Sequence, residues 1–289
     1  MLRIALPNKG RLAEEVTGLF ADAGLDLRTR GDRALVASLG GEFEAIFVRA
    51  RDIPEFVADG AADAGVTGLD LVCESGRTLT ELLDLEFGAC RLVVAAREES
   101  GIHSVEDISG APRVATVFPR LTRRFFETVG REVCLVPVSG AVEIAPHLGI
   151  ADIIVDLTST GSTMRVNNLR PVATVLESSA RLIAGHGTER AGRDARERGL
   201  AELSTALESV LRARGQRYLM ANVPRDALDR VKRVLPGLNG PTVIDVLDGG
   251  TYVAVHAVVP QRAVFRTIAD LRALGGQGIL VTRIERLTP

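Results

Sequence analysis

Short aliphatic segments alternate with amphipathic helical stretches along the first two thirds of the chain, and this alternation constrains the fold most strongly. Leu2–Leu6, Glu44–Val48, Ala62–Val66 and Cys90–Ala96 have the composition of buried strands. Between the first two, apolar side chains recur with the period of a helix that ends near Gly24. Alternating strands and helices are typical of an α/β protein, so we expect that fold class.

The alternation pauses at the polar stretch 97–103 and then restarts, which predicts a second α/β lobe. Further strands are expected at Arg113–Val117, Glu132–Val136, Ala151–Val155, Val172–Leu176 and Arg181–Ala184. We therefore predict a first lobe at 1–96 with a return segment at 181–214, and a second lobe at 97–180. Two lobes joined by two crossings leave a central cleft, a common place for ligands.

The last segment, residues 215–289, predicts a separate domain. Its expected strands are Tyr218–Val223, Thr242–Leu247, Tyr252–Val259 and Gly278–Thr282, and its expected helices are Asp226–Leu235 and Ala263–Leu274. The resulting βαββαβ order, with a glycine-rich turn at 248–250, is typical of a ferredoxin-like unit. It carries no evident catalytic constellation, so we interpret it as a regulatory or assembly domain.

Charge and cysteine content exclude several classes of protein. The net charge is −2, from 35 basic and 37 acidic residues, which predicts no nucleic-acid partner and no attraction to an anionic membrane. Hydrophobic runs stay well short of the ~20 residues of a membrane span, and the strand at Leu2–Leu6 begins too early for a signal peptide. The scattered Cys73, Cys90 and Cys134 fit reduced thiols rather than disulfides or zinc ligands. We therefore expect a cytoplasmic protein.

The loop at 152–164 carries the most chemical information. Asp156 lies at the end of an apolar strand. A stretch of hydroxyl-bearing residues around one glycine follows it, namely Thr158, Ser159, Thr160, Gly161, Ser162 and Thr163. Backbone N–H groups, hydroxyls and a following helix N-terminus can cradle a phosphate monoester, while the acid can hold sugar hydroxyls or a hydrated Mg²⁺. The same pattern also fits a capped helix start after a buried strand. The residues alone leave both interpretations open.

The segment from Glu143 to Met164 resembles the signature of the ATP phosphoribosyltransferase family, because its Glu, Gly, Asp and Thr-Gly-x-Thr fall at the family's spacing. The resemblance extends over the whole chain, through the blocks Leu2–Leu12, Gly65–Val72, Phe87–Val93 and Arg113–Pro119. The C-terminal unit is similar to the extra domain of the long form. The resemblance implies two lobes similar to type II periplasmic binding proteins, an active homodimer, and a homohexamer in the inhibited state.

The implied reaction joins N1 of the adenine of ATP to C1 of phosphoribosyl pyrophosphate and releases pyrophosphate. It is the first step of histidine biosynthesis and makes the protein a Mg²⁺-dependent pentosyltransferase. Adenine N1 already has a lone pair, so no Ser-His-Asp or Cys-His device is needed, and none is evident in the sequence. Catalysis then depends mainly on positioning and electrostatics.

For phosphoribosyl pyrophosphate, the resemblance places the 5′-phosphate on the turn Thr158–Thr163, with Asp156 and Glu143 orienting the ribose or its Mg²⁺. It implies no dedicated metal site, because the substrates carry the Mg²⁺ and either Asp156 or Glu143 contacts it. On sequence alone, Glu143 fits a solvated helix residue equally well.

For ATP and pyrophosphate, the resemblance implies that Lys9 and Arg11 face the phosphates and that Arg49 and Asp70 line the ATP side. Lys9 is one of only two lysines in a chain rich in arginine, and it lies in a loop just after a strand. Arg49 and Asp70 also have ordinary structural explanations, at a strand end and at a helix start.

The resemblance further implies feedback inhibition by histidine bound in the C-terminal domain. The matching positions are Asn222, Thr242, Val258 and Gly278, which we expect at strand ends or beside turns. Thr242 and Gly278 also suit the start of a strand.

Two other classes of protein would share a two-lobed cleft. The main alternative is a non-enzymatic protein that binds small solutes, which would normally carry a signal peptide or a lipidated cysteine. A transcription regulator with a ligand-binding core would normally carry a helix-turn-helix before the first lobe. Release of pyrophosphate from ATP and phosphoribosyl pyrophosphate separates these classes from the enzyme.

Overall fold

The computed structural model describes residues 1–29, 31, 34–185, 193–246 and 250–288. The chain divides into two compact units, Met1–Ser204 and Thr205–Pro289. Every helix within the described ranges is too short or too polar to cross a membrane.

The first unit contains two sheets, and its first lobe is built on the larger one. Among the described residues this sheet has the order β2 (Leu27–Thr29), β3 (Val36–Leu39), β4 (Phe43–Val48), β1 (Leu2–Pro7), β5 (Ala64–Gly68), β12 (Ala180–Gly185) and β6 (Leu79–Asp84). Its main helices are α1 (Arg11–Asp22), α2 (Ile53–Ala58) and α3 (Leu69–Ser75). The apolar stripe of α1, Val16, Leu19 and Phe20, is fully buried.

Parallel pairing in this sheet gathers three loops at one edge. β1 runs parallel to both β4 and β5, so the carboxyl ends of the three strands point the same way. The N–H of Asn8 donates to the carbonyl of Val48 at 2.9 Å, which fastens the loop after β1 to the end of β4. The hydroxyl of Thr67 donates to the carbonyl of Ala50 at 2.7 Å and ties β5 to the same edge. Ligands of α/β sheets bind at such carboxyl edges.

The second lobe is built on a mixed sheet. Its order, over the described chain, is β11 (Leu169–Ser178), β7 (Cys90–Arg97), β10 (Ile153–Thr158), β8 (Arg113–Thr116) and β9 (Cys134–Pro137). Helices α4 (Pro119–Thr128) and α5 (Ser162–Val166) follow β8 and β10. Phe126 of α4 is fully buried against Leu92 and Ile153 of the sheet.

The strand at Cys90–Ala96 is central and buried, as its apolar run predicts, because β7 pairs with both β10 and β11. Its assignment to the lobe at 1–96 is wrong, since β7 belongs to the second sheet. An apolar run predicts burial on both faces but carries no information on which sheet supplies the neighbours. The first crossing therefore precedes Cys90 instead of following Ala96.

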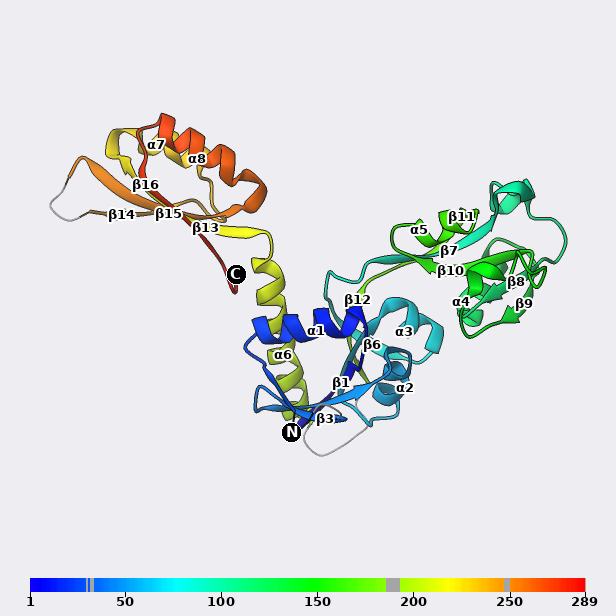
Figure 1. Ribbon diagram of the computed structural model, residues 1–289. Helices are drawn as coiled ribbons and strands as arrows, with labels where there is room; N and C mark the ends of the chain where they lie inside the picture. Colours follow the sequence, from blue (N-terminus) through cyan, green and yellow to red (C-terminus); the bar gives the residue numbers. More distant parts are fainter. Residues whose placement is uncertain (30, 32–33, 186–192, 247–249, 289) are drawn as a thin grey trace. The chain divides into compact units, whose positions relative to one another are not determined.

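The chain passes between the lobes twice. It leaves the first sheet after β6 and enters the second at β7, and it returns from β11 to β12 through Ser179. Figure 1 shows both connections, one in cyan before β7 and one in green between β11 and β12. The return strand β12 inserts between β5 and β6, in antiparallel pairing with both.

The second unit contains a four-stranded antiparallel sheet. Over its described residues the order is β14 (Thr242–Asp245), β15 (Tyr252–Pro260), β13 (Gln216–Pro224) and β16 (Gln277–Arg283). Helices α7 (Leu228–Val234) and α8 (Val264–Ala273) lie on one face (Figure 1), where apolar side chains of β13 and β15 are buried. The predicted α/β fold class with a ferredoxin-like unit is confirmed.

The boundary between the two units falls within the sequence of helix α6 (Arg193–Ala213). Residues from 205 onward belong to the second unit, ahead of the predicted domain start at 215. Of the turn predicted at 248–250, residues 248 and 249 lie outside the described residues, as do residues 186–192 of the predicted return segment.

Candidate active site

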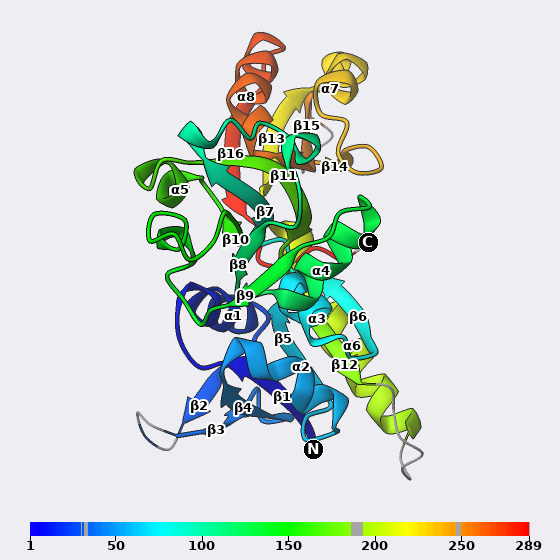
Figure 2. The same cartoon turned by 90° about the vertical axis from the view of Figure 1, so that its right-hand side faces the viewer.

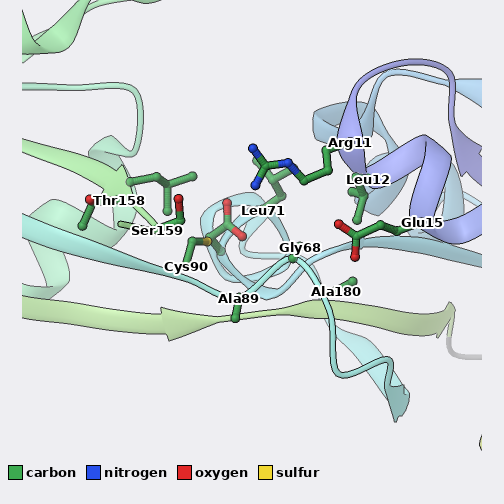
Figure 3. Close-up of a pocket in the computed structure, with 13 residues that line it drawn as sticks. Arg11, Leu12, Glu15, Gly68, Leu71, Ala89, Cys90, Thr158, Ser159 and Ala180 are labelled. Carbon is green, nitrogen blue, oxygen red and sulfur yellow. The ribbon is translucent and has the colours of Figure 1, made fainter. Parts of the chain in front are cut away.

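A cavity of about 410 Å³ opens in the first unit where elements of both lobes meet. Figure 3 shows it from within. The first lobe contributes the start of α1, the β5–α3 junction and the start of β12, and the second lobe contributes the approach to β7 and the end of β10. The lining residues are Arg11, Leu12, Glu15, Gly68, Asp70, Leu71, Gly88, Ala89, Cys90, Leu157, Thr158, Ser159 and Ala180.

The hydroxyl-rich turn after β10 is held in shape by its own side chains. The buried hydroxyl of Thr158 accepts a hydrogen bond of 2.9 Å from the N–H of Gly161, which adopts a left-handed φ of 73° before α5. The Thr160 and Ser162 hydroxyls are bonded at 2.9 Å. Of this turn, Thr158 and Ser159 line the cavity, whereas Ser162 and Thr163 are exposed beyond it. The turn is thus preorganised, with donors directed by a glycine conformation that other residues rarely adopt.

Two carboxyl groups, Asp156 and Glu143, lie close together on the second lobe. Burial raises the pKa of Asp156, the N–H of Leu157 opposes this by donating to it at 2.8 Å, and the charge of Glu143 raises the pKa further. Glu143 lies in a 3-10 turn (Val142–Ile144) after β9. Neither residue is among those lining the cavity. Their oxygens suit Mg²⁺ or sugar hydroxyls.

The negative charges of these two carboxyl groups repel each other, so a bound cation or hydroxyl donor would reduce the repulsion between them. Within the described chain, no group of three or more His, Cys, Asp or Glu side chains could hold a metal ion. The pair therefore fits a metal ion whose other ligands come mostly from substrate and water and not from the protein.

The cationic residues lie on the first lobe. Arg11, the first residue of α1, extends its guanidinium toward the side of the cavity that carries Thr158 and Ser159 (Figure 3). Lys9 and Arg49 are exposed on the loops that follow β1 and β4, which the Asn8–Val48 hydrogen bond holds together. These two residues share the carboxyl edge of the sheet but are not among the lining residues.

Asp70 lies in the first turn of α3 and is only 5% exposed. Its Oδ1 accepts a hydrogen bond of 2.6 Å from the hydroxyl of Ser178, and the Ser178 oxygen accepts one of 3.0 Å from the N–H of Asp70. Burial raises the pKa of Asp70, and the Ser178 hydrogen bond works against this shift. The Ser178 hydrogen bond and the N–H groups at the start of α3 therefore stabilise the charged form against the larger effect of burial.

The structure thus brings Arg11, Asp70, Thr158 and Ser159 to one cavity. Sequence reasoning missed Ser178, which contacts Asp70 across 108 residues of chain. It also missed Cys90, which lies opposite Ser178 in the β7–β11 pairing and whose pKa is raised by burial and by the nearby Asp70. The signal available was the polar pair Ser178-Ser179 between two apolar strands.

The four positions predicted to bind histidine gather on the second unit. Asn222 and Val258 lie on strands whose alternate residues are buried beneath α7 and α8, and they are on the opposite face. Thr242 lies on the exposed strand β14 and pairs with His256, which is on that same opposite face of β15. Gly278 has a φ of 57°, and a Cβ there would lie 3.4 Å from Nδ2 of Asn222. Asn222 and Gly278 are thus neighbours on adjacent strands, whereas Val258 pairs with Tyr218, four residues along β13 from Asn222.

Comparison with known proteins gives full-length matches. The sequence model described as ATP phosphoribosyltransferase matches residues 49–209, and that described as HisG, C-terminal domain, matches residues 213–286. A protein of Gemmatimonas aurantiaca named ATP phosphoribosyltransferase is 70% identical over 100% of both chains. One of the same name from Haloarcula marismortui is 53% identical over 99% of both.

Among solved structures, this chain resembles one from the ATP phosphoribosyl transferase (HisG:HisZ) complex of Thermotoga maritima, with a TM-score of 0.62 and 30% identity. The match covers 99% of that chain and 72% of this one.

Proposed function

The chain belongs to the ATP phosphoribosyltransferase family, and from that premise we propose how its cavity joins ATP to phosphoribosyl pyrophosphate. N1 of adenine attacks C1 of the ribose with its lone pair. The C1–O bond to pyrophosphate breaks, and the pyrophosphate leaves with the bonding electrons. The products are N1-(5-phosphoribosyl)-ATP and pyrophosphate.

One observation carries this proposal, namely that a single cavity is lined by the hydroxyl turn of one lobe and by Arg11 and Asp70 of the other. The turn supplies N–H and hydroxyl donors for the 5′-phosphate of phosphoribosyl pyrophosphate. Arg11 supplies positive charge, and Asp70 supplies an acceptor for nucleotide hydroxyls. Two substrates held from opposite walls meet at the middle, which is the arrangement that a bimolecular substitution needs.

Each described side chain then has an electrostatic task. Thr158, Ser159 and the N–H groups that follow fix the phosphate end of the sugar donor. Arg11, with Lys9 on the adjoining loop, stabilises the negative charge that develops on the leaving pyrophosphate. Arg49 attracts the phosphates of ATP from the same edge of the sheet.

We assign Asp156 and Glu143 to the ribose hydroxyls and to the Mg²⁺ that accompanies phosphoribosyl pyrophosphate. When bound, Mg²⁺ neutralises pyrophosphate oxygens and so favours departure of the leaving group. The pKa of Asp156, raised first by burial and then by the charge of Glu143, supports this assignment, because a bound cation would offset both effects. The chain itself orients the sugar and holds it in the cavity.

Regulation, assembly and location complete the proposal. Histidine, the end product of the pathway, inhibits by binding at Asn222, Thr242, Val258 and Gly278. The active form is a homodimer and the inhibited form a homohexamer, and the protein works in the cytoplasm. The match of residues 213–286 to the family's C-terminal domain supports the proposed regulation, because the four histidine positions lie in that segment.

The test is an assay of pyrophosphate release with the full-length protein, ATP, phosphoribosyl pyrophosphate and Mg²⁺. We expect pyrophosphate and the N1-linked nucleotide in equal amounts, and neither product when one substrate is omitted. Replacing ATP by 1-deaza-ATP, which lacks the attacking nitrogen, should stop the reaction. Pyrophosphate formed equally fast with that analogue would contradict the proposal.

A further inference from the structure

Helix α3 follows the first sheet in sequence, but its side chains divide between the two lobes. Val72 is buried in the core of the first lobe with Ile53 and Val57 of α2. Leu71 and Cys73, its immediate neighbours, pack against the core of the second lobe. The helix therefore has one apolar face in each lobe.

Two polar contacts bind the same helix to the second lobe. At its start, Asp70 exchanges hydrogen bonds of 2.6 and 3.0 Å with Ser178, the last residue of β11. One turn later, Glu74 accepts two hydrogen bonds of 2.9 Å from the N–H groups of Arg120 and Leu121 in the first turn of α4. Residues four apart lie on one side of a helix, so both contacts point to the second lobe.

The contact of Glu74 is a helix cap supplied by another element. The first N–H groups of a helix have no partner within it, and Phe118, at the N-cap of α4, makes no side-chain cap. The Glu74 carboxylate fills this role in bidentate fashion and also meets the positive end of the helix dipole. Figure 2 shows α3 beside α4. A Cβ at Gly76 would clash with the guanidinium of Arg120, so the end of α3 lies against a side chain of α4.

We propose that Ser178 and Glu74 are positioning residues that fasten α3 to the second lobe, so that the lobe carrying the hydroxyl turn also sets the place of Asp70 in the cavity. Neither residue lines the cavity. Both act through Asp70, Ser178 by direct contact and Glu74 through the orientation of the helix. The inference rests on the proposed role of Asp70 in binding ATP.

Ser178 can be tested against a matched control in the neighbouring Ser179, whose hydroxyl donates to Asp84 and accepts from Arg181 without touching Asp70. In full-length protein, Ser178→Ala should raise the KM for ATP about tenfold, the cost of a hydrogen bond to a charged group. The KM for phosphoribosyl pyrophosphate should stay within about twofold, as should both constants in Ser179→Ala. Ser178→Thr restores the hydroxyl and should restore the KM for ATP.

A pH profile distinguishes positioning from a general structural effect. The Ser178 hydrogen bond stabilises the Asp70 carboxylate, so its loss should move the acid limb of 1/KM for ATP to higher pH. The other titratable or charged groups facing Asp70 are Cys90 of β7, Cys73 of α3, and Arg11 and Glu15 of α1. Burial raises the pKa of both thiols, which keeps them neutral where a carboxyl titrates. A merely structural serine would leave the acid limb in place.

Glu74 provides a second, independent test. The exposed Glu127, near the other end of α4, serves as its control. Glu74→Gln keeps the size but can accept at only one oxygen, so the KM for ATP should rise about threefold to fivefold, as for a lost helix cap. Glu127→Gln should leave it within about twofold. If Ser178→Ala fails to fold, the comparison of Glu74→Gln with Glu127→Gln decides the question.

The outcomes separate the inference from the function on which it rests. If the unaltered protein releases no pyrophosphate from ATP and phosphoribosyl pyrophosphate, the proposed function is wrong. If it does, while Ser178→Ala and Glu74→Gln fold and match Ser179→Ala and Glu127→Gln in KM for ATP and in pH profile, the positioning role is overturned.

Discussion

Single backbone and side-chain positions determine both ends of the cavity. Gly161, next to the cavity-lining Thr158 and Ser159, has a φ of 73°, and its N–H donates to the hydroxyl of Thr158, which fixes the shape of the turn. At the opposite wall, Asp70 is a buried carboxyl held by Ser178. In both places a local interaction fixes the turn or the side chain before any ligand binds. A single substitution there can therefore change ligand affinity without unfolding the protein.

Gly161→Val should weaken binding of phosphoribosyl pyrophosphate by tenfold or more. A side chain is strained at this φ by about 1–3 kcal/mol, so the turn would have to rearrange and lose its directed donors. Gly101 has a φ of 75° and open space around it, so Gly101→Val imposes the same strain away from the cavity. Calorimetric titration measures both affinities. Unchanged affinity in Gly161→Val would refute the phosphate assignment.

Asp70→Asn should change how stability depends on pH. Burial raises the folded-state pKa of Asp70 above the ordinary value of about 3.9, so folding favours the protonated form. This contribution to stability is fully present below pH ~3.9 and is lost as the pH rises through the folded pKa. The side chain of asparagine does not titrate, so the Asp70→Asn variant does not lose this stability as the pH rises.

We therefore expect the free energy of unfolding of Asp70→Asn, relative to the unaltered protein, to increase from pH 3.5 to pH 7. Urea denaturation at several pH values measures it. A difference that stays constant, or that falls with rising pH, would show that burial does not dominate the pKa of Asp70.

Among secondary-structure elements, buried ones were predictable and marginal ones were not. The β7 segment is apolar and buried from Leu92 to Ala96, which predicts an interior strand. Strands β2, β3 and β6 were missed, and the sequence LTELLD of β6 shows why. Its side chains are at most half-buried, so neither a continuous apolar run nor a strict alternation marks it. Such a strand forms because β12 pairs with it.

The site was predictable to the extent that its chemistry is local. The turn from Thr158 to Thr163 is contiguous in sequence and was found. Ser178 was not, because its role depends on contact with a residue 108 positions away. The division of α3 between two lobes was equally hidden, since Leu71 and Val72 are both apolar and only the packing assigns them to different cores.

Helix α4 offers a stability test of the second lobe. Phe126 is fully buried in its core, so Phe126→Ala should lower the free energy of unfolding by about 3–5 kcal/mol. Phe265 of α8 is 86% exposed and serves as the control for removing a phenyl ring, with an expected change within about 0.5 kcal/mol. Chemical denaturation followed by circular dichroism measures both. Equal effects in the two variants would contradict the packing of α4.

At the level of the complete chain, catalysis and inhibition are assigned to different units. All residues that line the cavity belong to Met1–Ser204, and all four proposed histidine positions belong to Thr205–Pro289. Inhibition then requires histidine to bind two states of the protein with different affinity.

Truncation after Gly215 should abolish inhibition by histidine while leaving pyrophosphate release measurable. Because the cut removes most of the unit to which Leu207 and Leu211 belong, full-length Val258→Glu provides a second variant that places a charge on the proposed face. Rates measured over a histidine titration decide the matter. An inhibition curve unchanged in both variants would refute the location of the inhibitor site.

The insertion of β12 between β5 and β6 also determines when each sheet can be completed during synthesis on the ribosome. Every strand of the second sheet lies between residues 90 and 178, so that sheet can close as soon as this stretch has emerged. In the first sheet, β6 pairs among the described strands with β12, which is translated about a hundred residues later. The first sheet therefore lacks its pairing of β12 with β5 and β6 until every strand of the second sheet has been synthesised.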